Sequence, residues 1–206
     1  VTATANTGDA VILAGLTTTG TDEIAITLAN VSTTAANLNT INGKTNVAVN
    51  ANAISELTGN ATDIISAYTA NTAGTITGLG TKAVIVDNTA SAGNVNTIAN
   101  ATSGVVTATI TSGAVSSTLA AITNVNTSDV ITFTTTDTSV DASDLVALAA
   151  KVDTFTTSSI ANITEAYDTG SLITEVSNAL AIVPNATVTV TGGSISGSAA
   201  NSIANQ

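Results

Sequence analysis

The chain has 206 residues, a net charge of −11 and no Cys, His, Met, Trp or Arg. Serine and cysteine nucleophiles normally need a histidine base, and zinc, haem and iron–sulfur sites need His or Cys ligands, so these absences exclude the commonest catalytic and metal chemistry. The only cationic side chains are Lys44, Lys82 and Lys151, which argues against binding to nucleic acid or anionic membranes.

The composition nevertheless predicts a folded chain. Hydrophobic residues make up 44% of it and charged residues only 8%, whereas disordered chains combine low hydrophobicity with high charge. Aromatic residues make up 2%, so Ala, Val, Ile and Leu must form the core in thin layers. No apolar run reaches the length of a membrane span, so we expect no membrane insertion. The chain starts at Val1, without Met or a signal peptide, and we expect it to be a segment of a longer polypeptide.

In chain order, the first class of element is a short helix. Each segment has small or polar residues followed by apolar residues at helical spacing, and several have Asp or Asn at the start, where these residues cap helices. We expect one or two turns of helix in each of eight segments: residues 9–13, 35–41, 61–65, 92–98, 114–119, 142–148, 171–176 and 199–203.

Segments of β type lie between these helices. They alternate Thr with Val, Ile or Ala, which is typical of a strand with one buried face and one solvent-exposed face. Gly and Asn follow many of them and indicate turns. The clearest cases are residues 46–49, 74–79, 84–86, 105–110, 130–134 and 187–191.

The helix starts recur roughly every 27 residues, a period typical of repeat architectures. We therefore predict a mainly β fold: a parallel β-solenoid with about 27 residues per coil and a short helix in each coil. Residues 1–206 would form a single repeat domain. The alternative is a β-sandwich with Thr-rich strands.

Three motifs resemble repeats of giant cell-surface proteins of marine cyanobacteria and of fibre-like proteins of their phages. They are the Ala-Ala-Asn-Leu-Asn-Thr-Ile run at 35–41, the segment at 55–68 and Ala-Gly-Thr-Ile-Thr-Gly-Leu-Gly at 73–80, and residues 140–145 look like a further copy. The resemblance covers roughly residues 9–204, more loosely in 99–140 and 153–185. It implies a structural or adhesive role at a surface and identifies no catalytic residue.

The carboxylates are the candidate residues for metal binding or catalysis. Asp129, Asp137, Asp141, Asp144 and Asp153 lie close together in sequence, and calcium prefers oxygen ligands. Asp137, Asp141 and Asp144 are the weak calcium candidates, although neither an EF-hand loop nor a glycine-rich calcium repeat is present. A helix cap is the simpler interpretation of Asp141. Otherwise we expect no cofactor and no catalytic residue.

Two other activities have some support in the sequence. Paired carboxylates can hydrolyse polysaccharides, but the chain has few aromatic residues to hold a sugar. Rows of Thr suggest a flat ice-binding face, although the rows do not recur in every repeat. These rows are Thr107, Thr109 and Thr111; Thr132, Thr134 and Thr136; and Thr187, Thr189 and Thr191.

These observations predict a non-catalytic structural subunit or segment of an extracellular fibre, filament or surface layer. It would be found outside the cell, at the cell surface or on a virion. The expected partner is the chain itself, end to end through residues 9–28 and 186–204, because a repeat fold leaves strand edges open at its ends. The alternative is an adhesin or phage receptor-binding fibre that binds a surface glycan.

Overall fold

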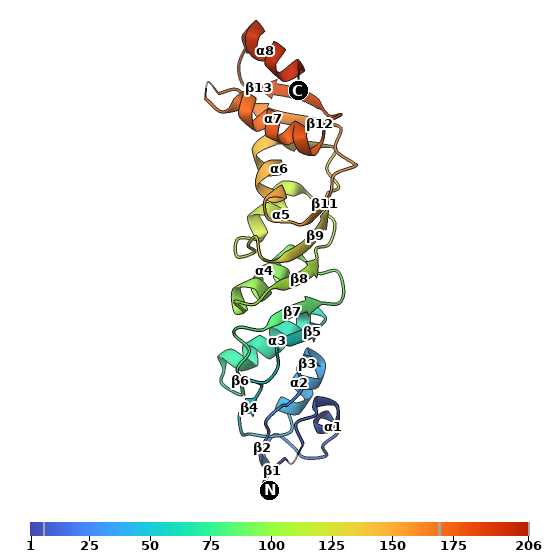
Figure 1. The fold of residues 1–206 in the computed structure, drawn as a ribbon, viewed down its shortest axis with the longest axis vertical. Helices are drawn as coiled ribbons and strands as arrows, with labels where there is room; N and C mark the ends of the chain where they lie inside the picture. Colours follow the sequence, from blue (N-terminus) through green and yellow to red (C-terminus); the bar gives the residue numbers. More distant parts are fainter. Residues whose placement is uncertain (6, 169, 206) are drawn as a thin grey trace. The chain divides into compact units, whose positions relative to one another are not determined.

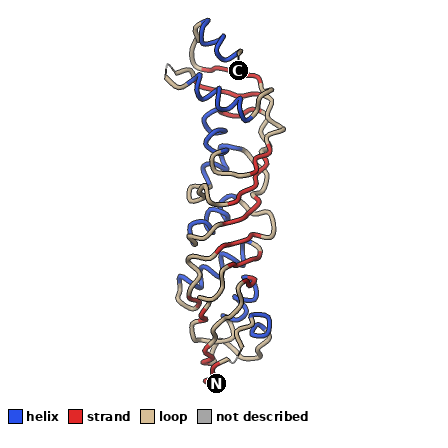
Figure 2. The backbone as a smooth tube through the Cα atoms, in the orientation of Figure 1, coloured by secondary structure: helices blue, strands red, loops and turns tan. Residues whose placement is uncertain are grey.

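A computed structural model describes residues 1–5, 7–168 and 170–205. Within them, eight helices and thirteen strands alternate along the chain (Figures 1 and 2). The contacts divide the chain into two compact units. The first comprises Val1–Thr109 and Asn124–Val130, and the second comprises Ile110–Thr123 and Ile131–Gln206.

The first unit holds four helices and eight strands of the described chain. The helices are α1 (Ala10–Ala14), α2 (Ala35–Asn42), α3 (Ala61–Thr72) and α4 (Ala92–Ala101). The strands are β1 (Thr2–Thr4), β2 (Glu23–Ala25), β3 (Ser32–Thr34), β4 (Val49–Asn50), β5 (Glu56–Gly59), β6 (Ile76–Thr77), β7 (Ala83–Val86) and β8 (Val106–Thr109).

Strands of successive repeats in the first unit pair in parallel. The pairs are β1 with β2, β4 with β6, β3 with β5, β5 with β7 and β7 with β8. The helices contact one another in the same order, α1 with α2, α2 with α3 and α3 with α4 (Figure 1). Each repeat therefore adds one helix to a helical layer and one or two strands to a parallel sheet.

The second unit continues the same βα pattern. Its helices are α5 (Val115–Ala121), α6 (Ala142–Ala149), α7 (Leu172–Ile182) and α8 (Gly197–Ala204). Its strands are β9 (Val130–Thr134, whose first residue belongs to the first unit), β10 (Ser139–Asp141), β11 (Thr154–Thr156), β12 (Asn162–Ala166) and β13 (Thr187–Thr191). β9 pairs with β11, and β10, β12 and β13 form a sheet in that order, all in parallel.

The core consists of thin layers of aliphatic side chains, as the composition requires. In α2, Leu38 and Ile41 are fully buried, and Leu57 of the adjacent β5 is buried with them. The sheets also accept stacked aromatic rings. Phe133 lies opposite Phe155 in the pairing of β9 with β11, with ring centroids 5.7 Å apart.

The predicted fold class is wrong, because the chain forms an α/β fold with parallel sheets rather than a mainly β solenoid. The helices hold more of the described residues than the strands, and α3 and α7 have 12 and 11 residues, about three turns each. The Thr-rich segments form strands of only two to five residues before a turn ends them. The parallel pairing within both units also contradicts the sandwich alternative, whose sheets are antiparallel. The single repeat domain over residues 1–206 stays a prediction.

Candidate functional site

Three of the carboxylates serve as hydrogen-bond acceptors for the backbone of another repeat. Three aspartates near strand or helix starts each accept a hydrogen bond from a backbone N–H 22 or 23 positions earlier. The three bonds are Asp129 Oδ1 with Val106 N at 2.9 Å, Asp137 Oδ2 with Val115 N at 2.7 Å, and Asp153 Oδ2 with Ile131 N at 2.9 Å. A charged acceptor makes such a bond stronger than a neutral one.

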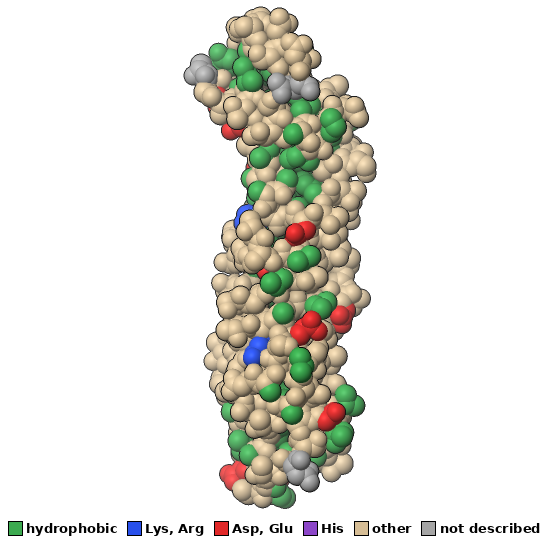
Figure 3. All heavy atoms as spheres, in the orientation of Figure 1, with side chains coloured by type: hydrophobic (Ala, Val, Ile, Leu, Met, Phe, Trp, Pro, Cys, Tyr) green, Lys and Arg blue, Asp and Glu red, His purple; other side chains and the backbone are tan. Residues whose placement is uncertain are grey.

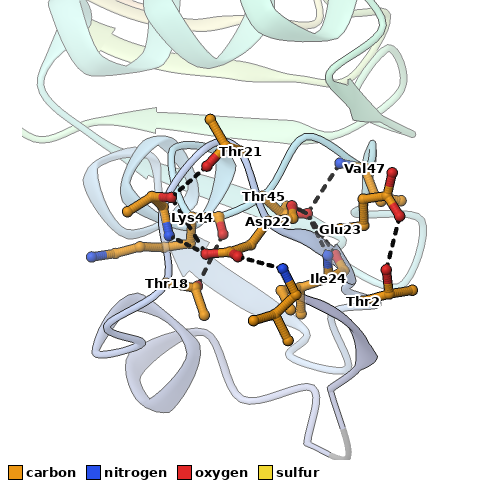
Figure 4. Close-up of polar contacts among 11 residues, drawn as sticks. Thr2, Thr18, Thr21, Asp22, Glu23, Ile24, Lys44, Thr45 and Val47 are labelled. Carbon is orange, nitrogen blue, oxygen red and sulfur yellow. Dashed lines mark hydrogen bonds and ion pairs between the residues drawn. The ribbon is translucent and has the colours of Figure 1, made fainter.

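Threonines make the same connection in the first unit. Thr45 is 6% exposed, and its Oγ1 accepts from Ile24 N at 2.9 Å and from Val47 N at 3.0 Å. The same hydroxyl donates to Ile24 O at 2.8 Å (Figure 4). Thr102 has the same role, since its Oγ1 donates to Lys82 O at 2.7 Å. We call these aspartates and threonines the inter-repeat clamps: Thr45, Thr102, Asp129, Asp137 and Asp153.

Outward-facing side chains add a weaker set of contacts along the strands. Thr2 Oγ1 donates to Glu23 Oε2 at 2.9 Å in the pairing of β1 with β2 (Figure 4). Ser32 Oγ donates to Glu56 Oε1 at 3.0 Å in the pairing of β3 with β5. Because parallel registration places equivalent residues side by side, polar side chains on the exposed faces pair with one another.

The three calcium candidates do not converge on one point. Asp137 bonds to Val115, whereas Asp141 caps α6 by accepting from Ser143 N at 3.0 Å and Asp144 N at 3.2 Å. Asp144 lies in the first turn of that helix. Among the residues that the structure describes, no group of three or more Asp, Glu, His or Cys is arranged to hold a metal ion. A calcium site here stays a prediction.

The assignment of Asp141 can be tested directly. Asp141→Ala is expected to lower the free energy of unfolding by about 1 kcal/mol, the usual cost of losing a helix cap. Urea denaturation with calcium and with chelator measures it, and Asp141→Ser, which retains capping, is the matched control. If calcium raises the midpoint of the wild type but not that of Asp141→Ala, Asp141 is a calcium ligand and not only a cap.

One buried carboxylate was missed at the sequence level. Glu165 lies on β12 and is 6% exposed, because it shares the inner face of the strand with the buried Ile163, two residues earlier. Its Oε1 accepts from Ala166 N at 2.8 Å, while its buried Oε2 has no hydrogen-bond partner. Burial raises the pKa of Glu165, and the charges of Asp141, Glu175 and Asp168 raise it further.

A second acidic residue missed at the sequence level orders the start of α7. Asp168 Oδ1 accepts from Gly170 N, Ser171 N and Leu172 N at 2.8, 2.7 and 3.2 Å. The hydroxyl of Ser171 also donates to Asp168, and these bonds hold the pKa of the carboxyl well below its usual range. Asp168 therefore holds the backbone that leads into α7, three residues before the N-cap position at Ser171.

A groove of about 590 Å³ lined by apolar side chains lies in the second unit between β13 and α8. None of the described residues that line it is charged. Val188 and Val190 on the inner face of β13 form one wall, and Ala200 and Ile203 of α8 form part of the other. α8 has no buried residue, so this helix and the inner face of β13 share an open apolar space.

No protein-family model, curated protein or solved structure matches this chain. Within the described residues, no helix has both the length and the apolar character needed to cross a bilayer.

Proposed function

We propose that this chain is a non-catalytic structural segment of an extracellular fibre, filament or surface layer. The observation that carries the proposal is the use of the polar side chains as inter-repeat clamps. Asp129, Asp137 and Asp153 accept from backbone amides of another repeat. The hydroxyl of Thr45 also accepts from such an amide, and that of Thr102 donates to a backbone carbonyl. An enzyme would need such groups at a cleft, facing a substrate.

The exposed surface also supports a structural role. In Figure 3, charged side chains are few and scattered over the visible face, among uncharged polar atoms and small apolar side chains. Binding hot spots are usually rich in aromatic residues, whereas in this chain Phe133 and Tyr68 are buried and Tyr167 is 39% exposed. This weighs against the adhesin alternative, whose glycan would need an exposed aromatic platform.

Immunogold labelling tests the proposed location. Antibodies raised against the chain, applied to thin sections of the cells or virus particles that make it, are expected to label fibres or a surface layer. Antibody absorbed beforehand with the purified chain is the control and should label nothing. Labelling confined to the cytoplasm would contradict the proposal.

A further inference from the structure

We propose that β13 and α8 of one copy bind β1 and α1 of a second copy by parallel strand addition. In this arrangement Thr2, Ala3 and Thr4 lie opposite Thr189, Val190 and Thr191. The inference rests on the proposed structural function and deepens it, because it names the partner, the two surfaces and the register of their pairing.

The spacing between strand and helix is the same at both ends of the proposed interface. β1 ends at Thr4 and α1 begins at Ala10, while β13 ends at Thr191 and α8 begins at Gly197, so a six-residue step separates strand end from helix start in both. Aligning Thr4 with Thr191 therefore also aligns the starts of α1 and α8.

The chain already contains an interface built on this rule. β12 pairs in parallel with β13, with Ala166 opposite Thr191, and α7 contacts α8. The same six-residue step leads from Ala166 to Leu172, where α7 begins. The paired strands β12 and β13 and the contacting helices α7 and α8 are thus separated by the same number of residues along the chain. β1 and α1 of a second copy would pack on β13 and α8 in the same way.

The free edges of β1 and β13 also have matching hydrogen-bonding groups. Val1 O accepts from Glu23 N at 2.7 Å and Ala5 N donates to Ala25 O at 3.0 Å, so the odd-numbered residues of β1 face β2. In a parallel ladder alternate residues bond to opposite sides, so the N–H and C=O of Thr2 and Thr4 face the free edge.

On β13 the free edge belongs to the even-numbered residues. Thr187 N donates to Ala161 O at 2.9 Å and Thr191 O accepts from Tyr167 N at 2.7 Å, so Val188 and Val190 direct their backbone groups away from β12. With Ala3 opposite Val190, Val190 N donates to Thr2 O and Thr4 N donates to Val190 O. The proposed register thus satisfies free backbone groups on both edges.

The pairing would also cover apolar surface on both copies. On the inner faces, Ala3 would meet Val190, which lines the groove. Val11 and Ile12 of α1 are 72% and 62% exposed, and the facing helix offers Ala200 and Ile203. The contact is heterologous, so repeated pairing builds an open chain of copies and not a closed dimer.

Sedimentation velocity on the full chain tests the pairing. The average mass of the wild type is expected to rise with concentration from 20.0 kDa to at least twice that value by about 1 mM. Thr4→Pro removes the donor N–H at the free edge but none of the bonds between β1 and β2, and it is expected to stay at 20.0 kDa. Ile12→Asp, which places a charge on the apolar surface, should do the same.

Two matched controls separate the proposed surface from general effects. Thr4→Val keeps the backbone N–H, and Val105→Asp introduces the same charge as Ile12→Asp on a residue far from β1 and β13 in the repeat order. Both are expected to associate like the wild type. Amide hydrogen exchange at Val190 should also slow at least tenfold as the concentration rises.

A wild type that stays monomeric to about 1 mM would overturn the pairing, as would association that survives both Thr4→Pro and Ile12→Asp. Neither result depends on where the protein is found. Immunogold labelling therefore tests the proposed function separately, and the failure of one can be told from the failure of the other.

Discussion

Replacing Asp129 with alanine is expected to lower the free energy of unfolding by about 3 kcal/mol. The Asp129 side chain is 3% exposed, and each of its oxygens accepts from a different backbone amide. Oδ1 lies 2.9 Å from Val106 N and Oδ2 lies 3.0 Å from Asn126 N. Alanine leaves both amides without these acceptors in a place that water reaches poorly, and each loss costs about 1–3 kcal/mol.

Urea denaturation followed by circular dichroism measures this change. Asp129→Asn retains one oxygen acceptor and should fall between the wild type and Asp129→Ala. Asp87→Ala removes an exposed aspartate from the first unit and should change the free energy of unfolding by less than about 0.5 kcal/mol. If Asp129→Ala is no less stable than Asp87→Ala, the clamps do not hold the repeats together.

The positions of the helices could be predicted from the sequence. Each of the eight predicted helical segments overlaps a helix of the structure, because the caps and the apolar spacing are local features. Asn60, for example, accepts from Asp63 N at 2.9 Å at the start of α3. Helix length was underestimated, since Ala and Thr after the first turn continue α3 to Thr72. This error accounts for much of the wrong fold class.

The clamps could not be predicted, because their partners depend on the offset between paired strands. Ser32 lies opposite Glu56, Val49 opposite Ile76 and Val84 opposite Val106, which are steps of 24, 27 and 22 residues. An average period of about 27 residues therefore places many pairs several positions from their true partners. Asp129 and Asp153 looked like neighbours in an acidic cluster, although each bonds to a backbone amide of another strand.

Glu165 shows a different limit of the sequence. It lies two residues after Ile163 and so shares its face of the strand, but a carboxylate in a Thr-rich strand is typical of the exposed face. The segment 153–185 also matched the repeat only loosely, so no equivalent position indicated burial. Glu165 lies opposite Val190 of β13, the edge strand of its sheet, and this pairing helps to bury the carboxylate.

Glu165→Gln is expected to raise the free energy of unfolding by about 2 kcal/mol at neutral pH. The buried Oε2 of the wild type has no hydrogen-bond partner, so the folded state disfavours the ionised carboxylate. The pKa of Glu165 in the folded state is raised, first by burial and then by neighbouring negative charges. Glutamine retains the oxygen that accepts from Ala166 N and replaces the charged oxygen with an uncharged NH2 group, which costs less to bury.

The sign of the pH dependence follows from that raised pKa. Below about pH 4, the pKa of an unfolded glutamate, the carboxyl is protonated in both states and ionisation costs the wild type nothing. As the pH rises, the unfolded state releases its proton first, and the penalty grows until the pH exceeds the folded pKa. The gain from Glu165→Gln should therefore be present at neutral pH and disappear below about pH 4. Urea denaturation at several pH values measures it, with the exposed Glu23→Gln as the control for losing one negative charge. A gain that is the same at pH 4 and pH 7, or a gain matched by Glu23→Gln, would show that burial of the Glu165 charge is not its cause.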